Sequence, residues 1–123
     1  MTKPLAVITG ASSGIGEATA KAFSNAGYPT LLLARRIEIM ESFNLKNSIC
    51  KKIDVRDRDA LVSAIREAEK QYGPTDMMFN NAGVARLADI STQDPSEWDE
   101  MIDVNTKGVM NGCLLYTSDA ADE

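Results

Sequence analysis

Residues 5–16 read LAVITGASSGIG, and this stretch decides the fold. Its first part, residues 5–9, is mostly apolar, which predicts a buried strand. Three glycines follow at the spacing G-x-x-x-G-x-G, namely Gly10, Gly14 and Gly16. Apolar side chains then recur at helical spacing on one predicted face, formed by Ile15, Ala18, Thr19, Ala22, Phe23 and Ala26. The stretch therefore predicts a strand, a glycine turn and a helix in direct succession.

A glycine turn between a strand and a helix is typical of a phosphate site. Glycine accepts a positive φ angle and lets a ligand approach the backbone closely. The start of the helix offers unpaired N–H groups and the positive end of its dipole to an anion. We therefore expect a nucleotide phosphate at residues 10–16, and the alternative is a purely structural turn.

The composition narrows the possible classes of protein. The chain has 123 residues, of which 44% are hydrophobic and 25% charged, as is usual for one globular domain. The net charge is −5 and no basic run is present, which argues against nucleic acids and anionic membrane surfaces as partners. No apolar run approaches the length of a membrane span.

The residue types also limit the chemistry. The sequence contains no histidine, which excludes Ser-His, Cys-His and His-ligated metal sites within it. Cys50 and Cys113 show no metal or redox spacing, so we predict no metal site and a cytoplasmic protein with reduced thiols. Acid–base chemistry would fall to tyrosine, lysine or carboxylates.

The rest of the chain alternates between the two kinds of element. We expect strands over residues 30–34, 48–53 and 76–79, and helices over residues 37–45, 58–72 and 95 to about 111. Continuous apolar runs, rather than alternating ones, indicate strands buried on both faces of a parallel sheet. Asp57 is expected to cap the helix that follows it. The pattern predicts an α/β fold, a Rossmann-type doubly wound parallel sheet that is incomplete, with four strands and flanking helices.

Two arginines follow the second predicted strand at its carboxyl end, Arg35 and Arg36. In a dinucleotide site, an acidic residue about 20 positions after the glycine turn binds the ribose 2′-hydroxyl. An arginine at that place suits a 2′-phosphate instead, because of its charge and its bidentate geometry. The pair therefore predicts NADP(H) rather than NAD(H) as the cofactor, and the alternative is a solvated arginine pair that opens a helix.

The last predicted helix begins with strong signals. Asp94 is a suitable cap, Pro95 suits the first helical position, and Glu97 stands where a capping-box partner would. Its predicted apolar face consists of Trp98, Met101, Ile102 and Val109, and Asn105 falls on the same face. A buried amide needs hydrogen-bond partners, and the simple alternative is that Asn105 bridges backbone groups.

Taken in order, the motifs resemble those of the short-chain dehydrogenase/reductase family from residue 3 to about residue 112. They are Thr9-Gly10-x-x-x-Gly14-x-Gly16, Arg35, Asp54-Val55, Asn80-Asn81-Ala82-Gly83 and Asn105-Thr106-Lys107-Gly108. The resemblance covers the amino-terminal half of a typical member. It implies an NADP(H)-dependent oxidoreductase that interconverts a small-molecule carbonyl and an alcohol by hydride transfer. It further implies an intact parent protein that is a homodimer or homotetramer.

The resemblance also implies roles for the glycine turn and the arginines. The glycine turn would hold the cofactor pyrophosphate, with Ser12, Ser13 and Ile15 beside it. The 2′-phosphate would be held by Arg35, together with Arg36 or Ser13.

Further roles follow from the later motifs. Asp54 would accept a hydrogen bond from the adenine amino group, and Val55 would flank the ring. The adenosine ribose and the nicotinamide side would be lined by Asn81, Ala82 and Gly83. Asn105 would be the asparagine of the catalytic tetrad, where it orders a water molecule. The alternatives are that residues 80–83 only stabilise the end of a strand and that Asp54 only terminates one.

The family's catalytic serine and Tyr-x-x-x-Lys motif have no counterpart in this sequence. The last lysine is Lys107, and Tyr116 is followed four residues later by Ala120. Residues 113–123 resemble one reading frame of a transposon-end adapter, and the alternative is a genuine acidic tail. We therefore expect a partial NADP(H)-binding domain over residues 1–112, a non-native tail over residues 113–123, and no turnover. A non-catalytic NADP(H)-binding or sensing module and a non-functional truncated fragment are the other possibilities.

Overall fold

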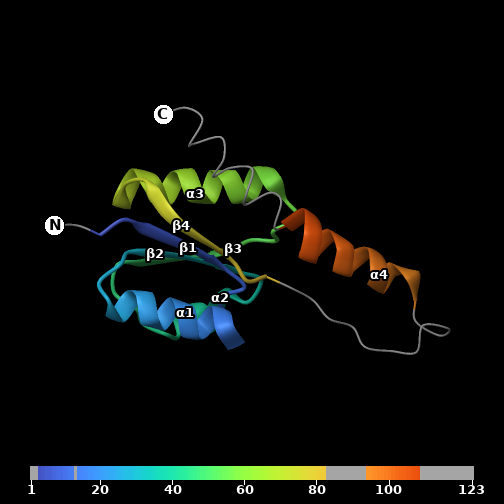
Figure 1. Ribbon diagram of the computed structural model, residues 1–123, viewed down its shortest axis with the longest axis horizontal. Coiled ribbons are helices and arrows are strands. Elements are labelled where there is room, and N and C mark those ends of the chain that lie inside the picture. Colours follow the sequence, from blue (N-terminus) through green and yellow to red (C-terminus); the bar gives the residue numbers. More distant parts are fainter. Residues whose placement is uncertain (1–2, 13, 83–93, 109–123) are drawn as a thin grey trace.

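A parallel sheet forms the centre of the molecule, seen in a computed structural model that describes residues 3–12, 14–82 and 94–108 (Figure 1). Its strands are β1 (Leu5–Thr9), β2 (Thr30–Ala34), β3 (Ser48–Lys52) and β4 (Thr75–Asn80). Their order is β3-β2-β1-β4, and every neighbouring pair is parallel. The predicted four-stranded parallel sheet is confirmed.

Helices cover both faces of the sheet (Figure 1). They are α1 (Gly14–Asn25), α2 (Ile37–Glu41), α3 (Arg58–Tyr72) and α4 (Pro95–Ile102), and a π-helical segment, η1 (Asp103–Gly108), continues α4. The first two helices lie on one face of the sheet and α3 on the other, while α4 stands beside the sheet near the carboxyl ends of the strands. This arrangement is the doubly wound layering expected from the alternating elements.

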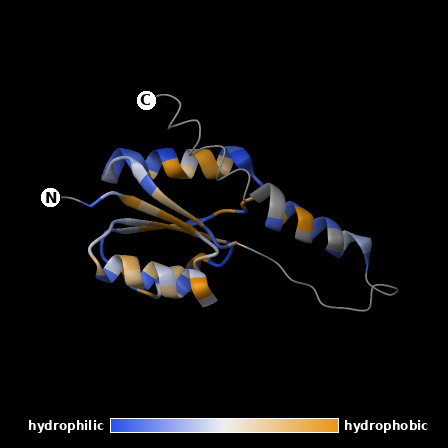
Figure 2. Ribbon diagram, viewed as in Figure 1, coloured by the Kyte–Doolittle hydropathy of each residue, from blue (hydrophilic) through white to orange (hydrophobic). Residues whose placement is uncertain are grey.

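The core divides into two clusters, one on each face of the sheet. On one face Leu5 and Val7 of β1 pack with Leu61 and Ile65 of α3. On the other face Ile8 packs with residues of α1 and α2. Figure 2 shows the hydrophobic residues concentrated in the strands between the two helical layers. Because the central strands are buried on both faces, their sequences are continuously apolar rather than alternating.

The predicted apolar face of the first helix is wrong. Ile15, at the start of α1, is 77% exposed, and the alanines predicted on the same face are exposed as well. The buried residues of α1 are Gly16 and Ala20, with Phe23 partly buried. Because these side chains are small, α1 can lie close to the sheet. The prediction relied on larger apolar residues and therefore chose another face of the helix.

The second and third helices differ in how well their ends were predicted. The segment expected as a helix over residues 37–45 forms only α2, which ends at Glu41. Asn44 and Asn47 both have positive φ angles, near 50°, and lie in the turn between α2 and β3. The third helix matches the prediction, because the Asp57 side chain accepts a hydrogen bond from the Ala60 amide and caps α3.

The last helix starts as predicted but continues differently. Asp94 caps α4 by accepting from the Ser96 amide. The helix becomes π-helical at Asp103. The predicted helix extended to about Asn111, and its last part, from residue 109 onward, lies outside the described residues.

The change of helix type alters which side chains face inward. Ile102 is 57% exposed, and Asn105 is exposed, so the prediction that these two lie on a packed face is wrong. Val104 is buried instead. A π-helix closes its hydrogen bonds at i→i+5, so the spacing of 3.6 residues per turn no longer describes the face from Asp103 onward.

Candidate functional site

A cavity of about 580 Å³ opens at the carboxyl ends of the strands. This size lies within the range usual for small-molecule sites. The cavity gathers many of the residues proposed from the sequence: Gly10, Ser12, Ile15, Gly16, Arg35, Arg36, Asp54, Val55, Asn81 and Ala82. Most of these residues come from the segments that directly follow the four strands, and Ile15 and Gly16 come from the first turn of α1. The topology thus brings together segments that are far apart in the sequence, as is usual for ligand sites in open α/β sheets.

Other proposed residues lie elsewhere. Gly14 and Asn105 do not line the cavity, although Val104, next to Asn105, does. Ser13 and Gly83 fall outside the described residues. The sequence analysis missed apolar parts of the wall, which include Ile39, Ile53 and Val104. Ile53 could have been found from the sequence, because it stands directly before Asp54, which was a proposed site residue.

Two glycines of the turn, Gly10 and Gly16, are packed too tightly for any other residue. A Cβ atom built on Gly16 would lie 2.0 Å from the carbonyl oxygen of Gly10. A Cβ atom on Gly10, whose φ angle is +63°, would lie 2.8 Å from the backbone of both Asn81 and Ala82. The two glycines therefore let the start of α1 and the end of β4 close around the cavity floor.

Thr9 joins the glycine turn to the segment after β4. Its side-chain oxygen accepts hydrogen bonds from the backbone amides of Asn81 at 3.0 Å and of Ala82 at 3.1 Å. The same hydroxyl donates to the carbonyl oxygen of Phe79 at 3.3 Å. Thr9 is almost completely buried, so these bonds are shielded from water. They fix Asn81 and Ala82 at the cavity wall.

The Asn81 side chain offers a free donor to a ligand. Its amide nitrogen Nδ2 is buried and has no hydrogen-bond partner among the described residues. An unsatisfied buried donor costs about 1–3 kcal/mol, so native proteins seldom retain one without a reason. A ligand oxygen in the cavity would supply the acceptor. Together with the close-packed glycines, this donor makes the cavity fit a phosphorylated, oxygen-rich ligand.

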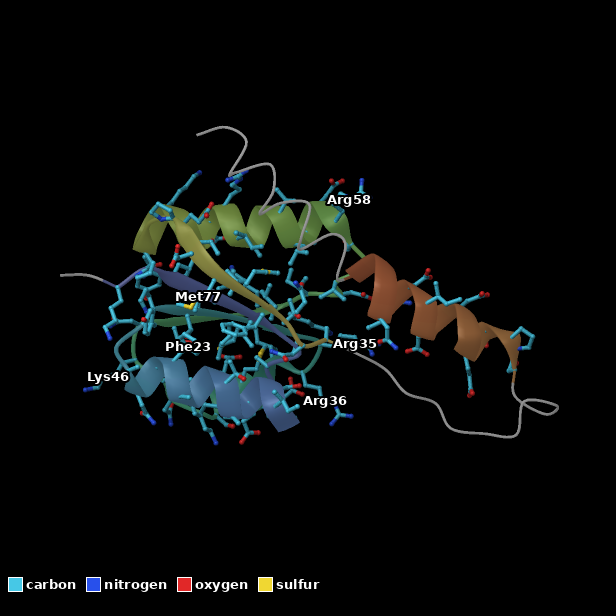
Figure 3. The ribbon with its side chains drawn as sticks, in the orientation of Figure 1. Phe23, Arg35, Arg36, Lys46, Arg58 and Met77 are labelled. Carbon is cyan, nitrogen blue, oxygen red and sulfur yellow. The ribbon has the colours of Figure 1, made fainter. Side chains whose placement is uncertain are left out.

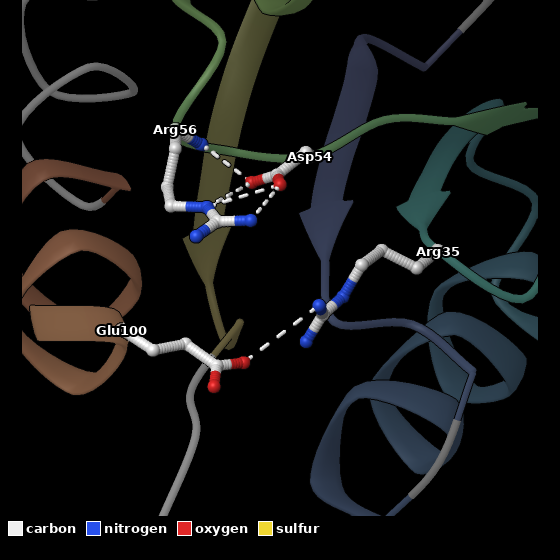
Figure 4. A network of polar contacts seen from close by, with 4 residues as sticks. All are labelled: Arg35, Asp54, Arg56 and Glu100. Carbon is white, nitrogen blue, oxygen red and sulfur yellow. Dashed lines mark hydrogen bonds and ion pairs between the residues drawn. The ribbon is translucent and has the colours of Figure 1, made fainter. Parts of the chain in front are cut away.

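Charged side chains meet at the cavity mouth (Figure 4). The Arg35 guanidinium Nη1 lies 3.9 Å from Oε1 of Glu100 on α4. Arg56 binds the Asp54 carboxylate through Nε, at 2.9 Å from Oδ1 and 3.0 Å from Oδ2. Sequence reasoning found neither Arg56 nor Glu100, although Arg56 stands only two residues after Asp54. Figure 3 shows Arg35 and Arg36 at the same end of the sheet, with Lys46 at its opposite end.

These contacts shift two pKa values. The side-chain hydrogen bond from Arg56 is the main cause that lowers the pKa of Asp54, and the charge of Arg35 adds to it. The hydrogen bond with Asp54 in turn raises the pKa of Arg56, with a smaller contribution from Glu100. Asp54 therefore remains ionised at neutral pH and is held in place as an acceptor. In residues 3–12, 14–82 and 94–108, no group of Cys, Asp and Glu side chains is arranged to hold a metal ion.

A comparison with known protein families shows to which family the chain belongs. Residues 4–120 match the model of the short chain dehydrogenase family. The chain belongs to this family. The matched range covers the glycine turn, both arginines, Asp54 and the Asn81 segment, which are the parts that the structure assembles around one cavity.

Individual relatives agree with this assignment. An uncharacterized oxidoreductase of Listeria monocytogenes is 40% identical over 112 residues, which are 86% of this chain and 45% of that protein. The crystal structure of the apo form of LigO from Sphingobium is similar with a TM-score of 0.86 and 32% identity, covering 94% of this chain and 46% of that one. An alcohol dehydrogenase from Thermococcus sibiricus, solved with 5-hydroxy-NADP, has a TM-score of 0.84 and 28% identity, covering 94% of this chain and 52% of that one.

The chain spans about half the length of the curated relatives that it matches, 45% of the Listeria protein for example. None of the helices in the described part of the chain combines the length and the apolar character that a membrane crossing requires.

Proposed function

We propose that this chain binds NADP(H) in the cavity and supplies the cofactor-binding part of an oxidoreductase. The whole protein would interconvert a small-molecule carbonyl and an alcohol, with the cofactor carrying the hydride. The observation that carries the proposal is the position of Arg35. Its half-exposed guanidinium lines the same cavity as the close-packed glycine turn. A cation at this place suits a 2′-phosphate, which NADP(H) has and NAD(H) lacks.

Each group of lining residues would bind a different part of the cofactor. The turn from Gly10 to Gly16 would hold the pyrophosphate, with Ser12, Ser13 and Ile15 beside it. Arg35 and Arg36 would bind the 2′-phosphate. Asp54 and Val55 would contact the adenine, and the unsatisfied Asn81 amide would donate to the ribose, with Ala82 and Gly83 next to it. The Thermococcus relative that was solved with 5-hydroxy-NADP supports this class of ligand.

Catalysis by the whole protein needs groups that this sequence does not contain. No tyrosine in it is followed four residues later by a lysine. We therefore propose that the 123-residue chain binds cofactor without turnover, and that Asn105 serves as the asparagine of the tetrad in the whole protein. The intact protein is proposed to be a cytoplasmic homodimer or homotetramer. The second candidate function is a non-catalytic NADP(H)-binding or sensing module, and a Tyr-x-x-x-Lys motif elsewhere in the whole protein would decide against it.

A fluorescence titration of the chain with NADPH and NADH tests the cofactor assignment. We expect saturable binding of NADPH that is tighter than the binding of NADH. Arg35→Ala should weaken NADPH binding about tenfold, since a hydrogen bond to a charged group contributes about 1.5 kcal/mol or more. The affinity for NADH should not change. Lys46→Ala is the matched control, because it removes one positive charge at the other end of the sheet.

Two results would contradict the proposal. The first is a titration in which NADPH shows no saturable binding, which would leave a fragment without ligand. The second is an Arg35→Ala variant with an unchanged preference for NADPH, which would remove Arg35 from the site.

A further inference from the structure

We propose that Glu100 of α4 reduces the discrimination in favour of NADP(H) over NAD(H), because it competes with the cofactor's 2′-phosphate for Arg35. This inference rests on the proposed NADP(H) site. It adds a residue that acts against the phosphorylated cofactor and that lies on a different element from the arginines.

The geometry places Glu100 beside Arg35, which lines the cavity. Figure 4 shows its side chain extending from α4 toward Arg35 near the end of β4. The two charged groups are 3.9 Å apart, and their side chains are 21% exposed for Glu100 and 54% exposed for Arg35. Val104, which follows on the continuation of the same helix, lines the cavity wall. This end of α4 therefore lies at the site and not on a remote surface.

Of the Asp54 and Glu100 carboxylates, Glu100 is the one that can compete with a phosphate for Arg35. Asp54 also faces this region, but Arg56 holds its carboxylate by several hydrogen bonds. The ion pair of Arg35 with Glu100 is long and half exposed, so it is weak and can exchange. A phosphate monoester carries between one and two negative charges at neutral pH and binds arginine in a bidentate way.

Competition acts on one cofactor only. A 2′-phosphate on Arg35 would meet the Glu100 carboxylate at the same guanidinium, so the pair must separate and the two anions repel each other. A 2′-hydroxyl brings no charge and needs no such separation. Glu100 therefore lowers the affinity for the phosphorylated cofactor and leaves the affinity for the other one unaffected.

The test measures binding by calorimetry with 2′,5′-ADP and with 5′-AMP, which differ in the 2′-phosphate. Glu100→Gln keeps the size of the side chain and removes its charge. We expect its Kd for 2′,5′-ADP to fall about two- to fivefold, the range that corresponds to a weak surface ion pair. The Kd for 5′-AMP should stay the same. High salt should reduce the gain in affinity for 2′,5′-ADP that Glu100→Gln produces, since exposed charges are screened.

Two further variants make the test specific. Asp99→Asn removes a negative charge from the neighbouring, exposed position of α4 and should not change either Kd beyond error. In an Arg35→Ala background, Glu100→Gln should lose most of its effect on 2′,5′-ADP, because the two side chains act on each other. Circular dichroism of each variant checks that the fold is retained.

The outcomes separate this inference from the function on which it rests. A Glu100→Gln variant that binds 2′,5′-ADP more weakly would show that Glu100 supports Arg35, which overturns the competition. An equal gain for both ligands, or an equal gain from Asp99→Asn, overturns it as well. If the unaltered chain bound neither 2′,5′-ADP nor NADPH, the proposed function itself would fail, and this inference with it.

Discussion

Thr9 holds the segment after β4 in place at the cavity wall. Its buried oxygen accepts hydrogen bonds from two backbone amides, those of Asn81 and Ala82. Thr9→Val keeps the shape of the side chain and removes this acceptor. We expect a loss of about 1–3 kcal/mol in the free energy of unfolding, the usual cost of leaving a buried donor unsatisfied. Urea denaturation followed by circular dichroism measures it.

Thr30→Val is the control for Thr9→Val. Thr30 is equally buried, but its hydroxyl bonds to the side chain of Ser48, which is only partly buried. Water can replace that partner, so we expect about 1 kcal/mol or less. Equal losses in the two variants would mean that Thr9 acts only as a buried side chain.

The lowered pKa of Asp54 makes the stability of the chain depend on pH. Because its pKa in the folded state lies below the ordinary value of about 3.9, ionised Asp54 stabilises the fold above that value. This contribution is lost as the pH falls through the folded-state pKa. Asp54→Asn should therefore be less stable than the unaltered chain at pH 7, and the gap should close below about pH 4. Urea midpoints at several pH values measure the gap, and a gap that stays constant would argue against this role.

At the residue scale, the sequence predicts contacts well where backbone geometry demands one residue type. Gly10 and Gly16 are such positions, since any side chain there would collide with backbone. The direction of a side chain is harder to predict. Ile15 was expected on the apolar face of its helix but is exposed at the cavity, where the family resemblance had placed it, and Asn105 was expected on a packed face and is exposed. Both depend on how a helix is rotated against its neighbours, which the local sequence does not determine.

At the scale of elements, α3 offers a direct test of capping. Asp57 accepts a hydrogen bond from the Ala60 amide at the start of this helix. Asp57→Ala should lower the free energy of unfolding by about 1 kcal/mol, the usual cost of losing a cap. Thermal unfolding measures the difference. Asp59→Ala, in the first turn of the same helix, changes only a favourable dipole contact and should cost less. If both variants cost the same, the cap is not what stabilises α3.

Element boundaries were predicted where a local signal marks them. The cap at Asp57 and the Asp94-Pro95 start gave correct helix beginnings. The early end of α2 and the π-helical turn at Asp103 were not predicted. In both cases the chain still contains apolar residues at plausible helical positions, so the sequence pattern continues while the backbone changes.

At the scale of the whole molecule, the site exists only when the sheet is assembled. Its lining comes from the end of β2, from the segments that follow each of the four strands, and from α1, α2 and η1. The alternation of elements in the sequence predicts that these strands are parallel, but it does not determine their order, β3-β2-β1-β4. The ion pair between Arg35 and Glu100 does not follow from it, because nothing in the local sequence near either residue indicates that α4 returns to the end of β2.

A ligand that contacts all these segments should stabilise the entire sheet. At an NADPH concentration about 100 times its Kd, binding adds about 2.7 kcal/mol, which raises the Tm of a domain of this size by about 10 °C. Differential scanning fluorimetry measures the shift, and each further tenfold increase in NADPH should raise the Tm by about half as much again, because it adds about 1.4 kcal/mol. Arg35→Ala at the same NADPH concentration should show about half of the shift, because a tenfold weaker Kd leaves about 1.4 kcal/mol of stabilisation. A Tm that does not respond to NADPH, or a shift of equal size in Arg35→Ala, would show that the cavity does not hold this cofactor as proposed.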